Sequence, residues 1–265
     1  MTENNPLIES PPEEVPLPAA PLVRVIAQVR FAPILAVRQA DFVAPFQEAI
    51  RAHYPMLREE HKQTIAFGPQ GGVAGERQVT WQFADPDDSW RTSLSPEFVA
   101  LETTVYSSRT DFIQRVRVLL EAVEEHLEPG FAVRVGLRYI DRVTGDALQR
   151  IARLVRPEML GIVRTPLFEH AEYELSDLLL RLPDASGRIR ARWGHLPAGA
   201  TIDPTAIEPG DEKSWILDLD MFSTERRPFQ AGPLADDLLR FAERIYAVFR
   251  WSVTDEFLRQ YGGTP

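Results

Sequence analysis

The sequence has no cysteine, which excludes disulfide bonds, thiolate nucleophiles, zinc ribbons and iron–sulfur clusters. This absence fits a reducing compartment, so we expect a cytoplasmic protein. No apolar run approaches the ~20 residues needed to cross a bilayer. The N-terminus has neither a basic start nor an apolar signal core. We therefore expect no membrane segment.

Several catalytic signatures are also missing. The sequence has no Gly-x-Ser-x-Gly, no HExxH and no Rossmann glycine set that opens a helix. Hydrolase, zinc-enzyme and nicotinamide-dependent activities therefore have no direct support. The histidines show no paired metal spacing; they are His53, His61, His126, His170 and His195. His195, in RWGHL, is either an acid or base or a packing residue at a strand end.

Positive charge is scarce relative to negative charge. The formal net charge of −10 argues against binding nucleic acid by phosphate neutralisation, because that mode needs a strong positive field. A chain of 265 residues with 44% apolar and 26% charged residues is typical of a globular protein with a substantial core.

The first 20 residues differ from the rest. They combine five prolines with four glutamates and have no usable period, so we expect a disordered or extended acidic arm over residues 1–20. Such an arm is either a solvated tail or a segment that docks on a partner. Residues 21–265 are expected to form a single α+β domain.

Hydrophobic periodicity in residues 21–265 predicts alternating blocks of strands and helices. Val25, Ala27 and Val29 alternate with polar residues, whereas Phe42, Phe46 and Ile50 recur at helical spacing. The glycines of GPQGGVAG, residues 68–75, lie between two strand patterns and indicate a hairpin rather than a phosphate loop. The expected strands are 23–31, 64–67, 79–83, 98–105, 131–142, 174–182, 188–196 and 215–222. Residues 90–94 either begin the strand at 98–105 or form a separate strand. The expected helices are 41–54, 107–127, 146–155, 234–249 and a C-terminal helix over 251–263.

This order suggests an internal repeat of strand, helix, three strands and helix. VIAQVRF at residues 25–31 resembles VRVGLRY at residues 133–139, so the halves would be 21–130 and 131–250. Short amphipathic matches also arise by chance, which leaves the repeat open. Either way, the pattern predicts an antiparallel sheet backed by helices on one face.

The segment GLRYIDRVTG, residues 136–145, carries unusual charges for a strand. Arg138 and Arg142 would face one side, ~13 Å apart, whereas Tyr139 and Asp141 would face the other. Arginines on one face suggest a place for carboxylates or phosphates. We expect a binding site formed by Arg30, Arg138, Tyr139, Asp141 and Arg142.

A structural alternative needs no ligand. The strand that carries Arg188, Arg190 and Arg192 could pair with the strand that carries Asp218 and Asp220, because guanidinium groups pair across strands.

Asp218 and Asp220 also raise the question of a metal site. An Asp-x-Asp on a strand presents two carboxylates on one face, as in Mg²⁺-dependent phosphoryl transfer, and Glu102 could add a third acid. No phosphate-binding loop accompanies the pair, which weakens this hypothesis.

Three stretches of the chain resemble a sporadically distributed bacterial family of about 260 residues. They are PLVRVIAQVRFAPIL at 21–35, GLRYIDRV at 136–143 and FRWSVTDEFLRQYGG at 249–263. The central motif of that family is LRYI(D/N)R. The resemblance implies no particular activity, but a patchy distribution suggests a regulatory or partner-binding role.

Two functions follow as hypotheses. In the first, which we favour, the protein is not an enzyme and needs no cofactor, and its open sheet face binds an acidic protein partner or a small anion. In the second, it is a metal-dependent phosphoryl-transfer or nuclease-like enzyme that uses Asp218 and Asp220 with Mg²⁺. Neither nucleic acid nor a membrane is an expected partner, and a homodimer is left open.

Overall fold

The computed structural model describes residues 5–68 and 71–265, with side chains outside residues 61–78. The strands are β1 (Leu22–Phe31), β2 (Met56–Gly68), β3 (Gly71–Ala84), β4 (Trp90–Ser95), β5 (Phe98–Thr103), β6 (Phe131–Val143), β7 (Glu174–Arg181), β8 (Arg188–Leu196), β9 (Ser214–Ser223) and β10 (Arg227–Pro228). The helices are α1 (Ala40–Ile50), α2 (Arg109–Leu127), α3 (Gly145–Gln149), α4 (Ile151–Leu154), α5 (Ala231–Ser252) and α6 (Asp255–Gln260), and four short 3₁₀ turns complete the set. No helix within the described residues is long and apolar enough to span a bilayer.

The strands form one open antiparallel sheet in the order β2-β3-β4-β5-β1-β6-β9-β8-β7, with β10 beside β6. This confirms the predicted α+β class. The chain also divides into two compact units that share β1 and β6. Unit 1 comprises residues 1–25, 136–223 and 239–265, and unit 2 comprises residues 26–135 and 224–238. These boundaries differ from the expected halves, so the internal repeat stays a prediction.

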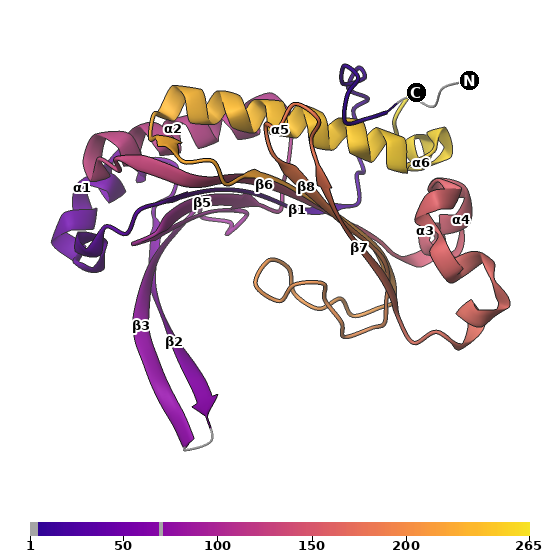
Figure 1. Cartoon of the computed structure of the whole chain (residues 1–265), viewed down its shortest axis with the longest axis horizontal. Helices are drawn as coiled ribbons and strands as arrows, with labels where there is room; N and C mark the ends of the chain where they lie inside the picture. The colour runs from indigo at the N-terminus through magenta and orange to yellow at the C-terminus, as the bar shows by residue number, and fades with distance from the viewer. Residues whose placement is uncertain (1–4, 69–70) are drawn as a thin grey trace. The chain divides into compact units, whose positions relative to one another are not determined.

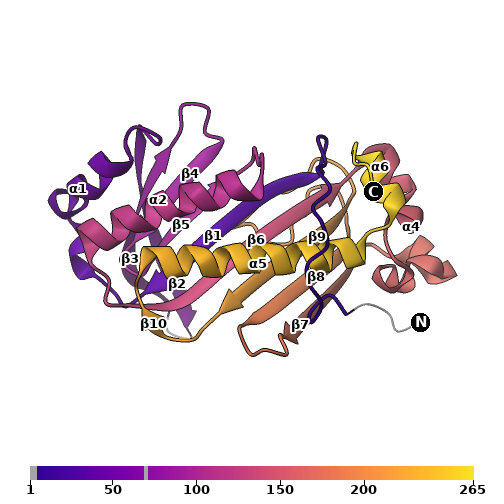
Figure 2. The ribbon, with the colours of Figure 1, turned by 90° about the horizontal axis from the view of Figure 1, so that it is seen from above.

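Unit 2 is built from strands β2 to β5 and helices α1 and α2 (Figures 1 and 2). Cross-strand register places Phe83, Thr92 and Leu101 in one row, and all three are buried. The ring of Phe46 from α1 packs edge-on against Phe83 at 5.7 Å between centroids. At the start of α2 the Asp111 amide donates to Ser108 Oγ at 3.1 Å, which caps the helix.

Unit 1 contains β7, β8, β9 and the C-terminal part of β6. Along β9, Trp215, Leu217 and Leu219 face one side and are buried, whereas the side chains between them face the other. This alternation gives unit 1 an apolar face, and the later part of α5 lies across β8 and β9 on that face (Figure 2). The opposite face carries the charged residues described below.

The N-terminal segment runs along α5 and α6 in irregular backbone. Tyr246 Oη accepts from the Val15 amide at 2.7 Å, and Arg244 Nη1 donates to the Pro6 carbonyl at 2.6 Å. The Ala19 amide donates to the Tyr261 carbonyl at 3.3 Å. Residues 5–20, expected to form a disordered or extended arm, therefore lie against their own unit in irregular backbone with turns at residues 6–8 and 18–19. Residues 1–4 lie outside the described residues.

Most expected elements are confirmed, with several corrections at their ends. The strand predicted at 64–67 extends back to Met56, where exposed charged side chains remove the alternating signal. It forms a hairpin with β3, Gly68 opposite Gly71, and residues 69–70 lie outside the described residues. The helix expected over 146–155 is interrupted at Arg150, which gives α3 and α4. The C-terminal helix is shorter than 251–263 because Val253 pairs with Val155 and interrupts it.

Candidate functional site

Charged side chains from three adjacent strands meet on the polar face of unit 1. Strand β9 lies between β6 and β8, so Asp218 is flanked by Arg138 and Arg192. Arg138 Nε donates to Asp218 Oδ1 at 2.7 Å and Arg138 Nη2 to Oδ2 at 3.0 Å. Arg192 Nε donates to Oδ2 at 2.9 Å. Asp218 is 1% exposed, so two guanidinium groups neutralise a fully buried carboxylate.

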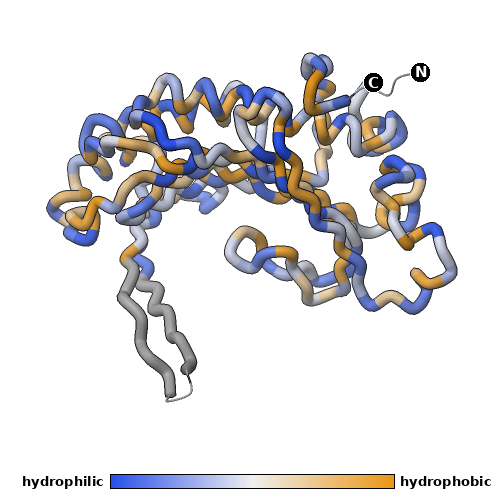
Figure 3. The backbone as a smooth tube through the Cα atoms, in the orientation of Figure 1, coloured by the Kyte–Doolittle hydropathy of each residue, from blue (hydrophilic) through white to orange (hydrophobic). Residues whose placement is uncertain are grey.

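The segment between β8 and β9, residues 197–213, lies against this face; we call it the acidic loop. It carries four acidic residues and one lysine, and its mixed hydropathy is visible in Figure 3. Asp203 Oδ2 accepts from Arg138 Nη1 at 2.8 Å, and the Glu208 carbonyl accepts from Arg142 Nη2 at 2.6 Å. Ala206 and Ile207 are buried, which adds an apolar anchor. Arginines of β6 thus hold the loop through one carboxylate and one carbonyl.

The pKa values follow from burial and from these bonds. Burial disfavours the charged form of Arg138, but the hydrogen bonds and charges of Asp218 and Asp203 outweigh it and raise the pKa of Arg138. Burial acts against Asp203 as well, and hydrogen bonds from Thr205 and Arg138 still lower its pKa. For Arg142, burial alone lowers the pKa. Arg138 and Asp203 are therefore both charged at neutral pH.

The structure separates the five residues predicted to form one binding site. Arg138 and Arg142 lie on the face that holds the acidic loop. Tyr139 and Asp141 point to the opposite face by strand alternation, and Asp141 is buried. Arg30 belongs to unit 2, where its Nη2 donates to Glu97 Oε2 at 2.7 Å.

Asp141 is an acid buried on the helix-covered side of β6. Burial raises its pKa to about 7. Its negative charge is felt by Tyr261 at the end of α6, whose pKa is raised to about 12, mainly by burial. Asp141 therefore changes charge near neutral pH without facing the arginine face.

The two aspartates predicted as metal ligands lie opposite arginines. The β8–β9 register pairs Asp218 with Arg192 and Asp220 with Arg190, as the structural alternative predicted. A metal ion at Asp218 would have to displace the guanidinium groups of Arg138 and Arg192. Among residues 5–68 and 71–265, no group of three or more acidic or histidine side chains could hold an ion. The metal site stays a prediction.

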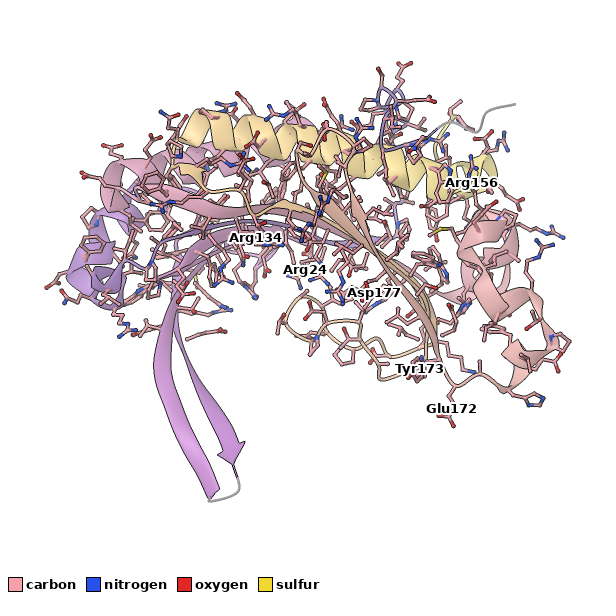
Figure 4. The ribbon with its side chains drawn as sticks, viewed as in Figure 1. Arg24, Arg134, Arg156, Glu172, Tyr173 and Asp177 are labelled. Atoms are coloured by element: carbon pink, nitrogen blue, oxygen red, sulfur yellow. The ribbon has the colours of Figure 1, made fainter. Side chains whose placement is uncertain are left out.

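The edge of this face contains arginines that the sequence did not single out as a pair. Arg181 of β7 lies directly opposite Arg188 of β8. Two residues along β8, Arg190 Nε donates to Asp177 Oδ1 at 2.8 Å. Figure 4 shows Asp177 on the side of β7 along which the acidic loop runs. The turn DASG, residues 184–187, predicts a hairpin between these strands, and the register of β7 and β8 then places Arg181 opposite Arg188.

His195 lies at the end of β8 in a confined environment. Its ring packs edge-on against Phe168 at 4.7 Å, and Nδ1 is 3.9 Å from Glu174 Oε2. Burial lowers the pKa of His195 to about 4, so it is neutral at pH 7. These contacts are those of a packed residue, as one of the two interpretations of RWGHL expected.

Comparison of the chain with protein-family models and with curated proteins finds no match.

Proposed function

We propose that the protein is a non-enzymatic binding or regulatory protein whose arginine face on unit 1 holds an acidic segment of a protein partner or a small anion. The observation that supports this function is the bond between Arg138 and Asp203. The chain's own acidic loop occupies the face in the way that an acidic ligand would. We treat this loop as an internal substitute for the ligand.

The two carboxylates on Arg138 have different roles in this proposal. Asp218 is buried at 1% exposure and fixes the guanidinium plane through Nε and Nη2. Asp203 is 25% exposed, lies on a connecting loop and occupies only Nη1. A ligand carboxylate would therefore replace Asp203 and leave Asp218 in place. A preorganised guanidinium loses little conformational freedom when it binds, which favours affinity.

The same arrangement weighs against the phosphoryl-transfer alternative. Mg²⁺ prefers carboxylate and water oxygens in octahedral geometry. Both oxygens of Asp218 already accept from guanidinium groups, so binding a cation there would leave Arg138 and Arg192 without their buried counter-charge.

Competition with the acidic loop provides a direct test. The probe is a labelled peptide with the loop sequence GATIDPTAIEPGDE, residues 199–212, and its binding is followed by fluorescence anisotropy. In the Asp203→Asn variant the side-chain oxygen can still accept from Thr205, as Asp203 Oδ1 does at 3.0 Å. The amide nitrogen cannot accept from Arg138, so the internal competitor is weakened.

We expect Asp203→Asn to bind the peptide about tenfold more tightly than the wild type, equivalent to ~1.4 kcal/mol. The matched control is Asp211→Asn, which removes the same charge from an exposed loop position. Adding Arg142→Ala to Asp203→Asn should lower the affinity again. Equal affinity of the wild type, Asp203→Asn and Asp211→Asn would contradict the proposal.

A further inference from the structure

Strand β7 forms one edge of the sheet. It pairs with β8 on one side and ends the strand order (Figure 2). An edge strand presents a row of backbone N–H and C=O groups that can pair with another strand. Strand β7 spans Glu174–Arg181, contains no proline and pairs with β8 without a register shift. Strand β7 therefore lacks two of the usual protections of an edge, a proline and a β-bulge.

Each face of β7 exposes a leucine beside its polar residues. Leu178 is 43% exposed on one face and Leu179 is 55% exposed on the other. Two exposed leucines at adjacent positions favour a further strand beside β7.

The sequence of β7 matches itself in antiparallel orientation. In a two-fold pair, opposed residues lie on the same face, so their numbers differ by an even number. With Leu179 on the axis, Asp177 lies opposite Arg181 of the second copy, and Leu178 lies opposite Leu180. The segment DLLLR therefore places opposite charges at both ends and leucine against leucine between them. Such cross-strand pairs stabilise a sheet.

The charges already present on β7 favour this register. Arg181 lies directly opposite Arg188, and like charges in that arrangement are destabilising. Neither arginine has an acidic partner among the residues that the structure describes. A carboxylate on the outer side of Arg181 would relieve this repulsion. Asp177 of a second copy would supply it through lone pairs that its bonds from Arg190 of its own chain leave over.

We propose that two copies of this chain associate through antiparallel pairing of their β7 strands about a two-fold axis at Leu179. A contact between two short strands buries less surface than the ~1,200–2,000 Å² of stable interfaces. We therefore expect a monomer–dimer equilibrium rather than an obligate dimer. This inference does not depend on the proposed function.

Charge exchange at the two ends of the segment tests the register. The experiment measures molar mass against concentration by sedimentation equilibrium. In Asp177→Arg, arginine would face arginine at both ends of the pair, and in Arg181→Asp, aspartate would face aspartate. Each variant alone should therefore dissociate at least about tenfold more readily than the wild type. An equimolar mixture of the two restores opposite charges at both ends, so the mixture should dimerise.

A second substitution tests the axis. Leu179→Lys places two ammonium groups against each other and should also weaken the dimer at least about tenfold. Leu35→Lys is the matched control, because Leu35 is an exposed leucine outside β7 and should leave the equilibrium unchanged. Circular dichroism reports whether each variant is folded, and dimerisation of the mixture would itself show that both partners are folded.

The outcomes separate clearly. A concentration-dependent wild-type dimer that each single charge variant weakens and the mixture restores would support the inference. A wild type that stays monomeric up to its solubility limit would overturn the inference. This holds even if β7 then pairs with an extended segment of another protein. Folded single variants that dimerise as well as the wild type would overturn it too.

Discussion

Replacing Asp141 by asparagine should change how the stability of the protein depends on pH. Burial raises the pKa of Asp141 from its ordinary value of 3.8 to about 7, so the folded protein holds a proton that the unfolded chain loses. The difference of about 3 pKa units corresponds to about 4 kcal/mol. Because the folded pKa is raised, wild-type stability falls as pH rises from ~4 to ~7 and is constant above that range. Asparagine cannot ionise, so the variant does not lose this stability as the pH rises.

The assay is urea denaturation of the wild type and Asp141→Asn at a series of pH values. We expect little difference near pH 4 and a gain for the variant of up to about 4 kcal/mol at pH 8. Tyr261 stays neutral throughout, since its pKa is about 12. Asp211→Asn, an exposed aspartate of the same unit, should show no such trend. A stability difference that does not vary with pH would refute the assignment of a buried, protonated Asp141.

Three further substitutions test local packing, two in unit 1 and one in unit 2. Asp218→Asn should cost about 3 kcal/mol in the free energy of unfolding, measured by urea denaturation, because it leaves buried guanidinium groups without their counter-charge. Gly194→Ala should cost well over ~1 kcal/mol and speed amide hydrogen exchange in β7, because its φ is +147° and the new Cβ would lie 2.1 Å from the Glu174 carbonyl oxygen. Ser108→Ala should lower the stability of unit 2 by about 1 kcal/mol through loss of the α2 cap. It should also reduce the protection of α2 amides from hydrogen exchange. If Gly194→Ala reduces that protection of α2 more than Ser108→Ala does, the prediction is contradicted.

Local periodicity was enough to predict most of the fold. Alternation predicted β1 and β9, and helical spacing predicted α2 and α5, because each buries one face against the core. The same reasoning predicted too short a strand for β2, because its exposed charged residues do not alternate in hydropathy. It also gave no signal for β10, which is only two residues long.

The candidate site was predictable only in part. Pairing of β8 arginines with Asp218 followed from matching charges on neighbouring strands and is confirmed by the register. The contact between Arg138 and Asp203 was not predictable, because Asp203 lies in a loop whose path depends on tertiary packing. Strand alternation correctly separated Asp141 from Arg138, yet it could not indicate that burial would raise the pKa of Asp141.

The division of the chain has a consequence for synthesis on the ribosome. Unit 2 needs residues 224–238, and unit 1 needs residues 239–265, although both begin near the N-terminus. Unit 2 is therefore incomplete until residue 238 has been synthesised, and unit 1 until residues 239–265 follow. Strands β2 to β5 are made long before residues 224–238, so we expect the segment that completes unit 2 to join it late in synthesis.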